Sequence, residues 1–451
     1  MTPAIDPRFF AKYDVPVPRY TSYPPVPAWS TAPSVETWID SLARALSPDD
    51  STLALYVHIP YCESLCTFCG CNTVITRDHG KENTYVAMVL RELDLYLQKV
   101  PLLASRPLRQ LHLGGGTPTF LSSASLRTLI EGVAARLSSR TDDFEGAIEV
   151  DPRVTTAEQL ETLRSCGMNR VSFGVQDIDP HVQRLVNRIQ PPELTAALVA
   201  AARASEFGSI SLDLIYGLPG QTEASMKRLT DEVLRLAPDR LAVYSFARVP
   251  WIKPAQRRFK DEDVPVGAAK RALYDVVREA VVDAGYLEIG MDHFARPHDA
   301  LAKAALEGRL HRNFMGYTDT HTRALLALGV SGISETPDCY HQNEKVATVY
   351  ERRVNAGEIP MLRGHLLSRE DQRRAGQITA LMTRYRVELD AGDLDAARPA
   401  LAPLIDDGLV RVEGTTLLVP PAGRPFLRHA ASAFDAYFTT DPGTPRYSNA
   451  V

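Results

Sequence analysis

The stretch Cys62-Glu-Ser-Leu-Cys66-Thr-Phe-Cys69-Gly-Cys71 decides how the rest of the sequence is interpreted. It follows an apolar, β-branched run at 53–59, which predicts a buried strand that ends at the next proline. Three cysteines spaced by three and then two residues on one short loop can bind a single metal centre. A four-iron cluster held by three cysteines leaves one iron without a protein ligand, and that iron can bind a small molecule.

Other interpretations of these cysteines stay open. Zinc also binds thiolates, but structural zinc sites generally use four ligands in separated pairs, and no second CxxC or HxxxH pattern occurs. A disulfide between Cys66 and Cys69 would join residues too close in sequence for an ordinary bridge. Burial as small hydrophobic residues suits Cys166 and Cys339 but accounts poorly for the loop. Iron–sulfur chemistry is therefore the favoured interpretation.

Composition indicates an ordinary globular protein, with 451 residues, 45% hydrophobic and 23% charged. No apolar run reaches the ~20 residues that span a bilayer, and the N-terminus lacks a signal pattern. We therefore expect a cytoplasmic protein that binds no membrane. The net charge of −5 also argues against general attraction to nucleic acid, so a polyanionic substrate would need a local basic pocket.

Strands and helices alternate from residue 53 to about residue 245. Buried strands in repeated βα units predict a parallel sheet with right-handed crossovers, and about six units favour a partial barrel. Active residues then gather at the C-terminal ends of the strands. The predicted strands are 53–59, 108–113, 146–150, 170–175, 210–216 and 240–246, with one more at 325–333. The predicted helices are 34–47, 82–98, 122–137, 156–165, 193–204, 222–236 and 267–284.

Several candidate site residues sit at these strand ends. The run Gly114-Gly115-Gly116-Thr117-Pro118 lets backbone groups approach a ligand, although a tight turn would need glycines too. Glu149 and Asp213 lie in or after apolar strands, where a carboxylate needs a partner, and this favours a functional role. Gln176 ends another strand, and Arg188 could pair with a carboxylate, although the sequence by itself favours a surface salt bridge.

The CxxxCxxC pattern after a first strand resembles the radical S-adenosyl-L-methionine (SAM) superfamily. The longer stretches Tyr56-Val-His-Ile-Pro-Tyr61-Cys62 and Cys69-Gly-Cys71-Asn72 are similar to the oxygen-independent coproporphyrinogen III oxidases (dehydrogenases) of that superfamily. The similarity extends from Pro18-Arg19-Tyr20-Thr21-Ser22-Tyr23-Pro24 into the last hundred residues. The expected fold is thus an α/β, partial (β/α)6 TIM-like barrel of the radical SAM type.

The expected organisation has three parts. Residues 1–50 form an extended N-terminal arm with a leading helix, and residues 51–364 form the barrel with accessory segments. Residues 365–451 form a mostly helical, winged-helix-like domain, with helices at 368–389 and 421–438 around a helix and hairpin that start near 401. Its would-be wing carries little basic charge, which favours a lid or packing role over DNA binding.

The resemblance implies roles for individual residues. Cys62, Cys66 and Cys69 would bind a 4Fe-4S cluster. The SAM on the open iron would be lined by Tyr56, Gly115, Glu149 and Ile333, with Tyr56 and Glu149 as the catalytic candidates. A second SAM would contact Phe68, Gly116, Thr117, Gln176, Arg188, Asp213 and Ala247. Cys71 matches a cysteine that is not a cluster ligand in the family, and its role stays open.

The implied reaction is the oxidative decarboxylation of two propionates of coproporphyrinogen III to vinyl groups, giving protoporphyrinogen IX for haem biosynthesis. The implied electron donor is a reduced flavodoxin or ferredoxin, and the expected state is a monomer. Basic and aromatic residues at 290–297 and 310–317 suit a flat macrocycle with carboxylates. Arg19, Arg296 and Arg312 are the candidates for the propionates, and Met315 stands where some family members carry a polar residue.

Two alternatives remain. The first is a related radical SAM protein, either a haem chaperone or a radical methyltransferase; the chaperones typically lack the N-terminal arm and the equivalent of Cys71, which are present here. The second is a non-enzymatic zinc or DNA-binding protein. Iron content separates the second alternative from the first, and the nucleoside product of SAM cleavage separates a methyltransferase from an oxidase.

Overall fold

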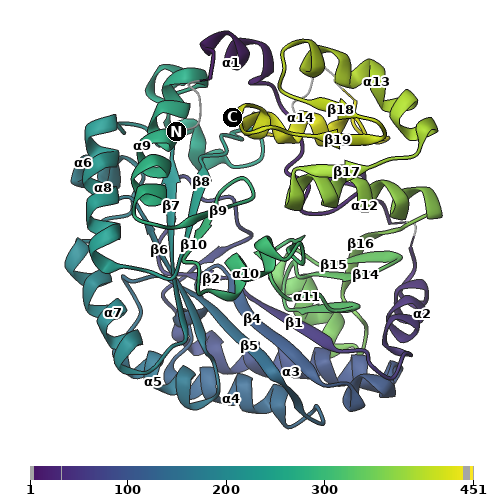
Figure 1. The fold of residues 1–451 in the computed structure, drawn as a ribbon. Coiled ribbons are helices and arrows are strands. Elements are labelled where there is room, and N and C mark those ends of the chain that lie inside the picture. Colours follow the sequence, from purple (N-terminus) through teal and green to yellow (C-terminus); the bar gives the residue numbers. More distant parts are fainter. Residues whose placement is uncertain (1–4, 32, 440–446, 450–451) are drawn as a thin grey trace.

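The computed structural model describes residues 5–31, 33–439 and 447–449 and is organised around one 12-stranded sheet (Figure 1). The strand order is β16-β15-β14-β13-β1-β4-β5-β6-β7-β8-β10-β9. Neighbours from β13 to β8 pair in parallel, with bounds β1 Leu53–Ile59, β4 Leu108–Gly115, β5 Arg140–Val150, β6 Arg170–Gln176, β7 Ser209–Tyr216, β8 Arg240–Ser245 and β13 Ala324–Leu328. The predicted parallel sheet is confirmed.

Antiparallel strands extend both edges of the parallel region. One edge carries β14 Ile333–Thr336, β15 Cys339–Asn343 and β16 Met361–Leu366, and the other carries β9 Leu287–Ile289 and β10 His293–Ala295. Within the described residues no ladder joins β16 to β9, so the barrel is partial. Three small sheets lie apart from the large one: β2 Tyr61–Cys62 with β3 Val74–Ile75, β11 His311–Asn313 with β12 Gly316–Thr318, and a three-stranded sheet in the C-terminal segment.

Helices connect the strands and cover the outside of the sheet (Figure 1). Several begin at side-chain caps: Thr156 and Gln159, for example, form a capping box for α5, and Gly167 with φ +90° follows its end. The barrel helices are α2 Val35–Leu46, α3 Glu82–Lys99, α4 Ser123–Ala134, α5 Ala157–Ser165, α6 Pro180–Leu185, α7 Pro192–Ala204, α8 Glu223–Leu236, α9 Gly267–Asp283, α10 Ala300–Leu306 and α11 Ala347–Asn355.

The predicted strand at 325–333 is wrong, because the chain turns in its middle. β13 ends at Leu328, and the backbone reverses through Gly329 (φ +90°) and Ser331 (φ +61°) before β14 returns antiparallel to β13. The buried Val330 in the middle of this turn continued the apolar pattern of β13, so the reversal was missed. Glycine and a left-handed residue are what such a reversal requires.

The N-terminal arm and the C-terminal segment share a second hydrophobic core. Helix α1, Pro7–Tyr13, lies within the arm predicted to be extended (Figure 1). Its Phe10 packs with Phe426 beside α14, Leu427–Ser432. The remaining elements are α12 Arg369–Arg384, β17 Arg386–Glu388, α13 Ala391–Asp406, β18 Arg411–Glu413 and β19 Thr416–Leu418. The three-part domain division stays a prediction.

Helix ends in the C-terminal segment differ from those predicted. α12 ends at Arg384 and not at 389, because Tyr385 takes a left-handed conformation (φ +56°) and a strand follows. α13 begins ten residues before the predicted 401, and the predicted helix at 421–438 is a 3-10 turn at Pro421–Phe426 followed by the short α14. Among the residues with assigned positions, no helix is both long and apolar enough to cross a membrane.

Candidate active site

A cavity of about 780 Å³ lies at the C-terminal ends of the parallel strands. The cysteine loop after β1 lines one side, and residues of the arm and of the β11–β12 hairpin line another. Of the predicted site residues, those that line the cavity are Tyr56, Cys62, Cys66, Phe68, Cys69, Gly115, Gly116, Thr117, Glu149, Gln176, Arg188, Asp213 and Ile333. Ala247 is not among the lining residues, and its carbonyl accepts a hydrogen bond from Gln256 (3.2 Å).

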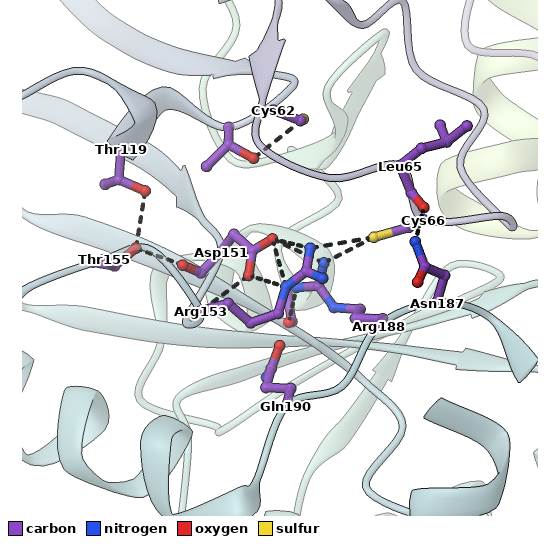
Figure 2. A network of polar contacts seen from close by, with 12 residues as sticks. Cys62, Leu65, Cys66, Thr119, Asp151, Arg153, Thr155, Asn187, Arg188 and Gln190 are labelled. Carbon is purple, nitrogen blue, oxygen red and sulfur yellow. Dashed lines mark hydrogen bonds and ion pairs between the residues drawn. The ribbon is translucent and has the colours of Figure 1, made fainter. Parts of the chain in front are cut away.

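The cysteine loop is fixed by backbone contacts with the segment after α6 (Figure 2). The Thr67 N–H donates to the Val186 carbonyl at 3.0 Å, and the Asn187 side chain donates to the Leu65 carbonyl at 2.8 Å. Because several donors and acceptors of the loop are satisfied from outside it, the loop holds its shape and presents its sulfur atoms to one cavity.

Two arginines place positive charge beside Cys66 (Figure 2). Arg153 Nη2 lies 3.3 Å and Arg188 Nη1 3.5 Å from Cys66 Sγ. Asp151 Oδ2 accepts from both, at 2.6 Å and 3.1 Å. Burial opposes the ionisation of Asp151, but Arg188 and Arg153 hold its pKa below the usual range. A thiolate at Cys66 therefore sits beside a preformed, charge-balanced cationic group.

The other two cysteines have different surroundings. Cys62 Sγ lies 3.3 Å from Thr117 Oγ1, and burial raises the pKa of the Cys62 thiol to about 11. A hydrogen bond from the Cys71 side chain, with a smaller contribution from the Cys71 N–H 3.4 Å from Cys69 Sγ, lowers the pKa of Cys69. Metal binding requires thiolates, so binding a metal centre here releases protons.

The three cysteines fit an iron–sulfur cluster. All three are free thiols that line one cavity, and the arginines beside Cys66 suit an anionic cluster. In residues 5–31, 33–439 and 447–449, no three His, Cys, Asp or Glu side chains converge as a single metal ion requires.

Glu149 is held by groups on the neighbouring strands. Its carboxylate accepts from His112 Nε2 at 3.0 Å and from the Gly115 N–H at 3.4 Å. Burial opposes its ionisation, but the hydrogen bond from His112 keeps the pKa of Glu149 lowered. A Cβ at Gly115 would lie 2.7 Å from His58 Cε1, and its φ is +113°. Only glycine fits that position, so the glycine run packs against β1 as well as lining the cavity.

Asp213 is a buried acid with one hydrogen-bond donor. Ser172 Oγ donates to Asp213 Oδ1 at 2.8 Å, and burial raises the pKa of Asp213 to about 7. The carboxyl group therefore holds a proton over much of the range below neutrality, which lets it donate or accept a hydrogen bond in the cavity.

The opposite wall is basic and aromatic. Arg19 pairs with Asp292 at 2.6 Å, and Asp292 also pairs with His293 Nδ1 at 2.7 Å. Arg312 stacks 4.4 Å from the centre of the Tyr317 ring, and its Nε and Nη1 have no hydrogen-bond partner in the described chain. Arg296 does not line the cavity and stacks over Tyr286 at 4.5 Å, so of the three arginine candidates only Arg19 and Arg312 are brought together there.

Sequence reasoning missed several lining residues. Asp151 and Arg153 directly follow the strand that ends near Glu149, so the strand-end rule could have included them. His58 lies inside the Tyr56–Cys62 match, where it bridges the Tyr56 hydroxyl (3.2 Å) and the Asn72 carbonyl (2.9 Å). Lys253 and Lys345 carried no sequence signal, because irregular segments bring them to the cavity.

Comparisons with known proteins agree with this geometry. The family described as the radical SAM superfamily matches residues 56–233. The oxygen-independent coproporphyrinogen III oxidase of Escherichia coli (strain K12) is 40% identical over 450 residues, which cover 98% of this chain and 97% of the relative. The protein of the same name from Pseudomonas aeruginosa is 39% identical over 443 residues, which cover 96% of each.

A solved structure leads to the same family. The coproporphyrinogen III oxidase from Escherichia coli, described as a radical SAM enzyme, superposes with a TM-score of 0.89 at 39% identity. The match covers 97% of this chain and 100% of that chain. It therefore bears out the predicted partial barrel, and this chain belongs to the oxygen-independent coproporphyrinogen III oxidases of the radical SAM superfamily.

Proposed function

We propose that the cavity converts two propionates of coproporphyrinogen III into vinyl groups and so forms protoporphyrinogen IX. Each propionate loses a hydrogen atom from its β-carbon, then carbon dioxide and one electron. The observation that carries the proposal is one cavity in which a three-cysteine loop faces a wall with the buried Arg312. The three-cysteine loop suits hydrogen abstraction, and the wall with Arg312 suits the binding of a carboxylate.

Cys62, Cys66 and Cys69 would hold a 4Fe-4S cluster, and Tyr56, Gly115, Glu149 and Ile333 would line the SAM beside it. When bound, the two groups supply the capacity to remove a hydrogen atom from an unactivated carbon. The chain's own residues bind and orient these groups and the substrate. The Glu149 carboxylate, held by His112 and Gly115, is placed to accept from a ribose hydroxyl or an ammonium group.

Arg312 is the strongest candidate for a propionate. Arg312 is 7% exposed, and two of its guanidinium nitrogens lack partners among the described residues. A buried cation with free donors is costly unless an anion pairs with it, and guanidinium binds carboxylate through two parallel hydrogen bonds. Arg19 is already paired with Asp292, so it would orient Asp292 and His293 more than bind substrate.

The finer points of the proposal are a second SAM, the electron donor and the oligomeric state. Six of the seven residues carried over for a second SAM line the cavity, namely Phe68, Gly116, Thr117, Gln176, Arg188 and Asp213. A reduced flavodoxin- or ferredoxin-type carrier would supply the electron. A monomer suffices, because one chain supplies both walls of the cavity. A reducing compartment such as the cytoplasm suits the six free cysteines.

An anaerobic assay with reductant, SAM and coproporphyrinogen III tests the proposal. We expect protoporphyrinogen IX, carbon dioxide and 5′-deoxyadenosine to form together. Formation of S-adenosylhomocysteine would instead indicate a methyltransferase, and tight haem binding without vinyl products would indicate a chaperone. Equilibrium binding of labelled SAM to the reconstituted protein tests the second site, with two equivalents expected per chain.

A further inference from the structure

Three cations gather at the rim of the cavity and have no carboxylate partner among the residues that the structure describes. Lys253 lies in the segment after β8, Lys345 between β15 and α11, and Arg363 on β16. Lys253 and Lys345 line the cavity, and Arg363 reaches its edge through Gln342, a lining residue whose Oε1 accepts from Arg363 Nε at 2.9 Å. Three separate parts of the chain therefore supply positive charge to one rim.

The hydrogen bonds of these cations leave their charge unbalanced. Lys253 Nζ donates to the Cys71 carbonyl at 2.7 Å, and the Lys345 ammonium makes no side-chain hydrogen bond within the described residues. The acid next to Lys345 in sequence, Glu344, is occupied by Arg353 at 3.1 Å. No ion pair to any of the three cations occurs within the described ranges, in contrast to Arg153 and Arg188 beside Cys66.

Neighbouring charge and burial act on these groups in the direction expected for an unfilled anion site. Desolvation, together with the nearby Arg363 and Lys253, lowers the pKa of Lys345. Desolvation also lowers the pKa of Arg363. Both shifts mean that the protein itself does not offset the desolvation cost of the charged Lys345 and Arg363 side chains. An anion bound at the rim would offset that cost.

The surface beside the cations is apolar. Ile252 is 58% exposed and lines the cavity next to Lys253, and Val346 is 56% exposed next to Lys345. An occupant with a flat apolar body and peripheral carboxylates matches this combination, because the body can cover the apolar residues while the carboxylates reach the cations.

We propose that Lys253, Lys345 and Arg363 form a rim station for the propionate carboxylates of the tetrapyrrole that point away from the reacting side chain. The inference rests on the proposed function and extends it by assigning the outer carboxylates. Arg312, deep in the cavity, holds the macrocycle near the reacting centre, and the rim station sets its orientation. The station explains how a chain with a net charge of −5 binds a substrate with four carboxylates.

Binding of coproporphyrin III, the stable aromatic analogue, to the anaerobically reconstituted protein tests the station. We expect Lys345→Met and Lys253→Met to weaken binding by about three- to fivefold each, the size of one half-exposed ion pair. The salt dependence of the dissociation constant should become shallower in both variants, which a purely structural defect would not produce. Lys345→Arg should restore the wild-type affinity and salt dependence. Lys303 is an exposed lysine on α10, and Lys303→Met is the matched control.

The outcomes are separable. Unchanged affinity and unchanged salt dependence in the Lys253→Met/Lys345→Met double variant would overturn the station, provided that its visible cluster absorption and SAM binding match the wild type. Failure of the wild-type protein to bind coproporphyrin III would overturn the proposed function itself. If coproporphyrin III binding stayed unchanged and only turnover with a protein electron donor fell, the rim would be assigned to donor docking and the station would be contradicted.

Discussion

The two walls of the cavity differ in how their charges are balanced. On the cysteine side, Arg153 and Arg188 both pair with Asp151, and Glu149 is held by His112. On the opposite side, Arg19 pairs with Asp292, but Arg312 has two nitrogens without partners in the described chain. The arginines beside Cys66 are charge-balanced without a ligand, whereas Arg312 has no carboxylate partner among the described residues.

This difference in charge balance indicates which kind of ligand each wall binds. A resident cofactor needs side chains that are already oriented, and ion pairs within the protein supply that orientation. A substrate that comes and goes can bring its own counter-charges, so its binding residues stay unpaired until it arrives. On this account, substitutions on the first wall damage the protein or its cluster, and substitutions on the second damage substrate binding.

The largest expected effect is on the first wall. Cys66→Ala should abolish the broad visible absorption of the reconstituted protein and reduce turnover to background, because a three-cysteine site has no ligand to spare. Iron and sulfide analysis measures the loss. Cys166→Ala, a buried cysteine outside the cavity, should keep full iron content. Equal iron in the two variants would break the assignment of the loop.

The second prediction concerns the ion pairs behind that loop. Asp151→Asn leaves two largely buried arginines without their counter-charge, so the free energy of unfolding should fall by about 3–5 kcal/mol. Urea unfolding of the apoprotein measures it. The control is Asp143→Asn, which breaks an exposed pair with Arg109 and should cost at most ~1 kcal/mol. Equal losses would mean that the Asp151 pairs do not stabilise the wall.

The third prediction concerns Arg312 on the opposite wall. Arg312→Met removes a buried cation that lacks full pairing, so the free energy of unfolding should not fall. Affinity for coproporphyrin III should fall by roughly 10- to 100-fold, because the substrate carboxylate loses its partner. Arg296→Met, away from the cavity, is the matched control. A stability loss in Arg312→Met as large as that of Asp151→Asn would contradict the contrast.

The smallest expected effect concerns Asp213, an acid on the first wall that accepts a hydrogen bond from Ser172 and forms no ion pair with the described residues. Because burial raises its folded pKa to about 7, the folded protein keeps a proton that the unfolded chain has released above its ordinary pKa. Stability should therefore fall as pH rises, with Asp213 contributing about 1 kcal/mol of the loss between pH 6 and pH 7. Asp213→Asn should remove that contribution in urea titrations at the two pH values. An unchanged pH slope would mean that Asp213 is ionised in the fold.

Local patterns predicted the parallel sheet and the cysteine loop, but not the charge balance. Alternating strands and helices, like the CxxxCxxC spacing, are patterns among residues that are close together in the sequence. The contact between Arg153 and Cys66 joins residues 87 positions apart, and only the fold brings them together. The same reason explains Arg296: its residue type suited a carboxylate, but the chain places it against Tyr286.

The most direct test of the two-wall account measures two affinities in two variants. In reconstituted Arg312→Met, binding of coproporphyrin III should weaken by at least about tenfold while SAM binding stays within about twofold of the wild type. In Arg188→Met the pattern should reverse, with weaker SAM binding and unchanged coproporphyrin III binding. If both variants weakened both ligands to the same extent, the division of the cavity into a cofactor wall and a substrate wall would be wrong.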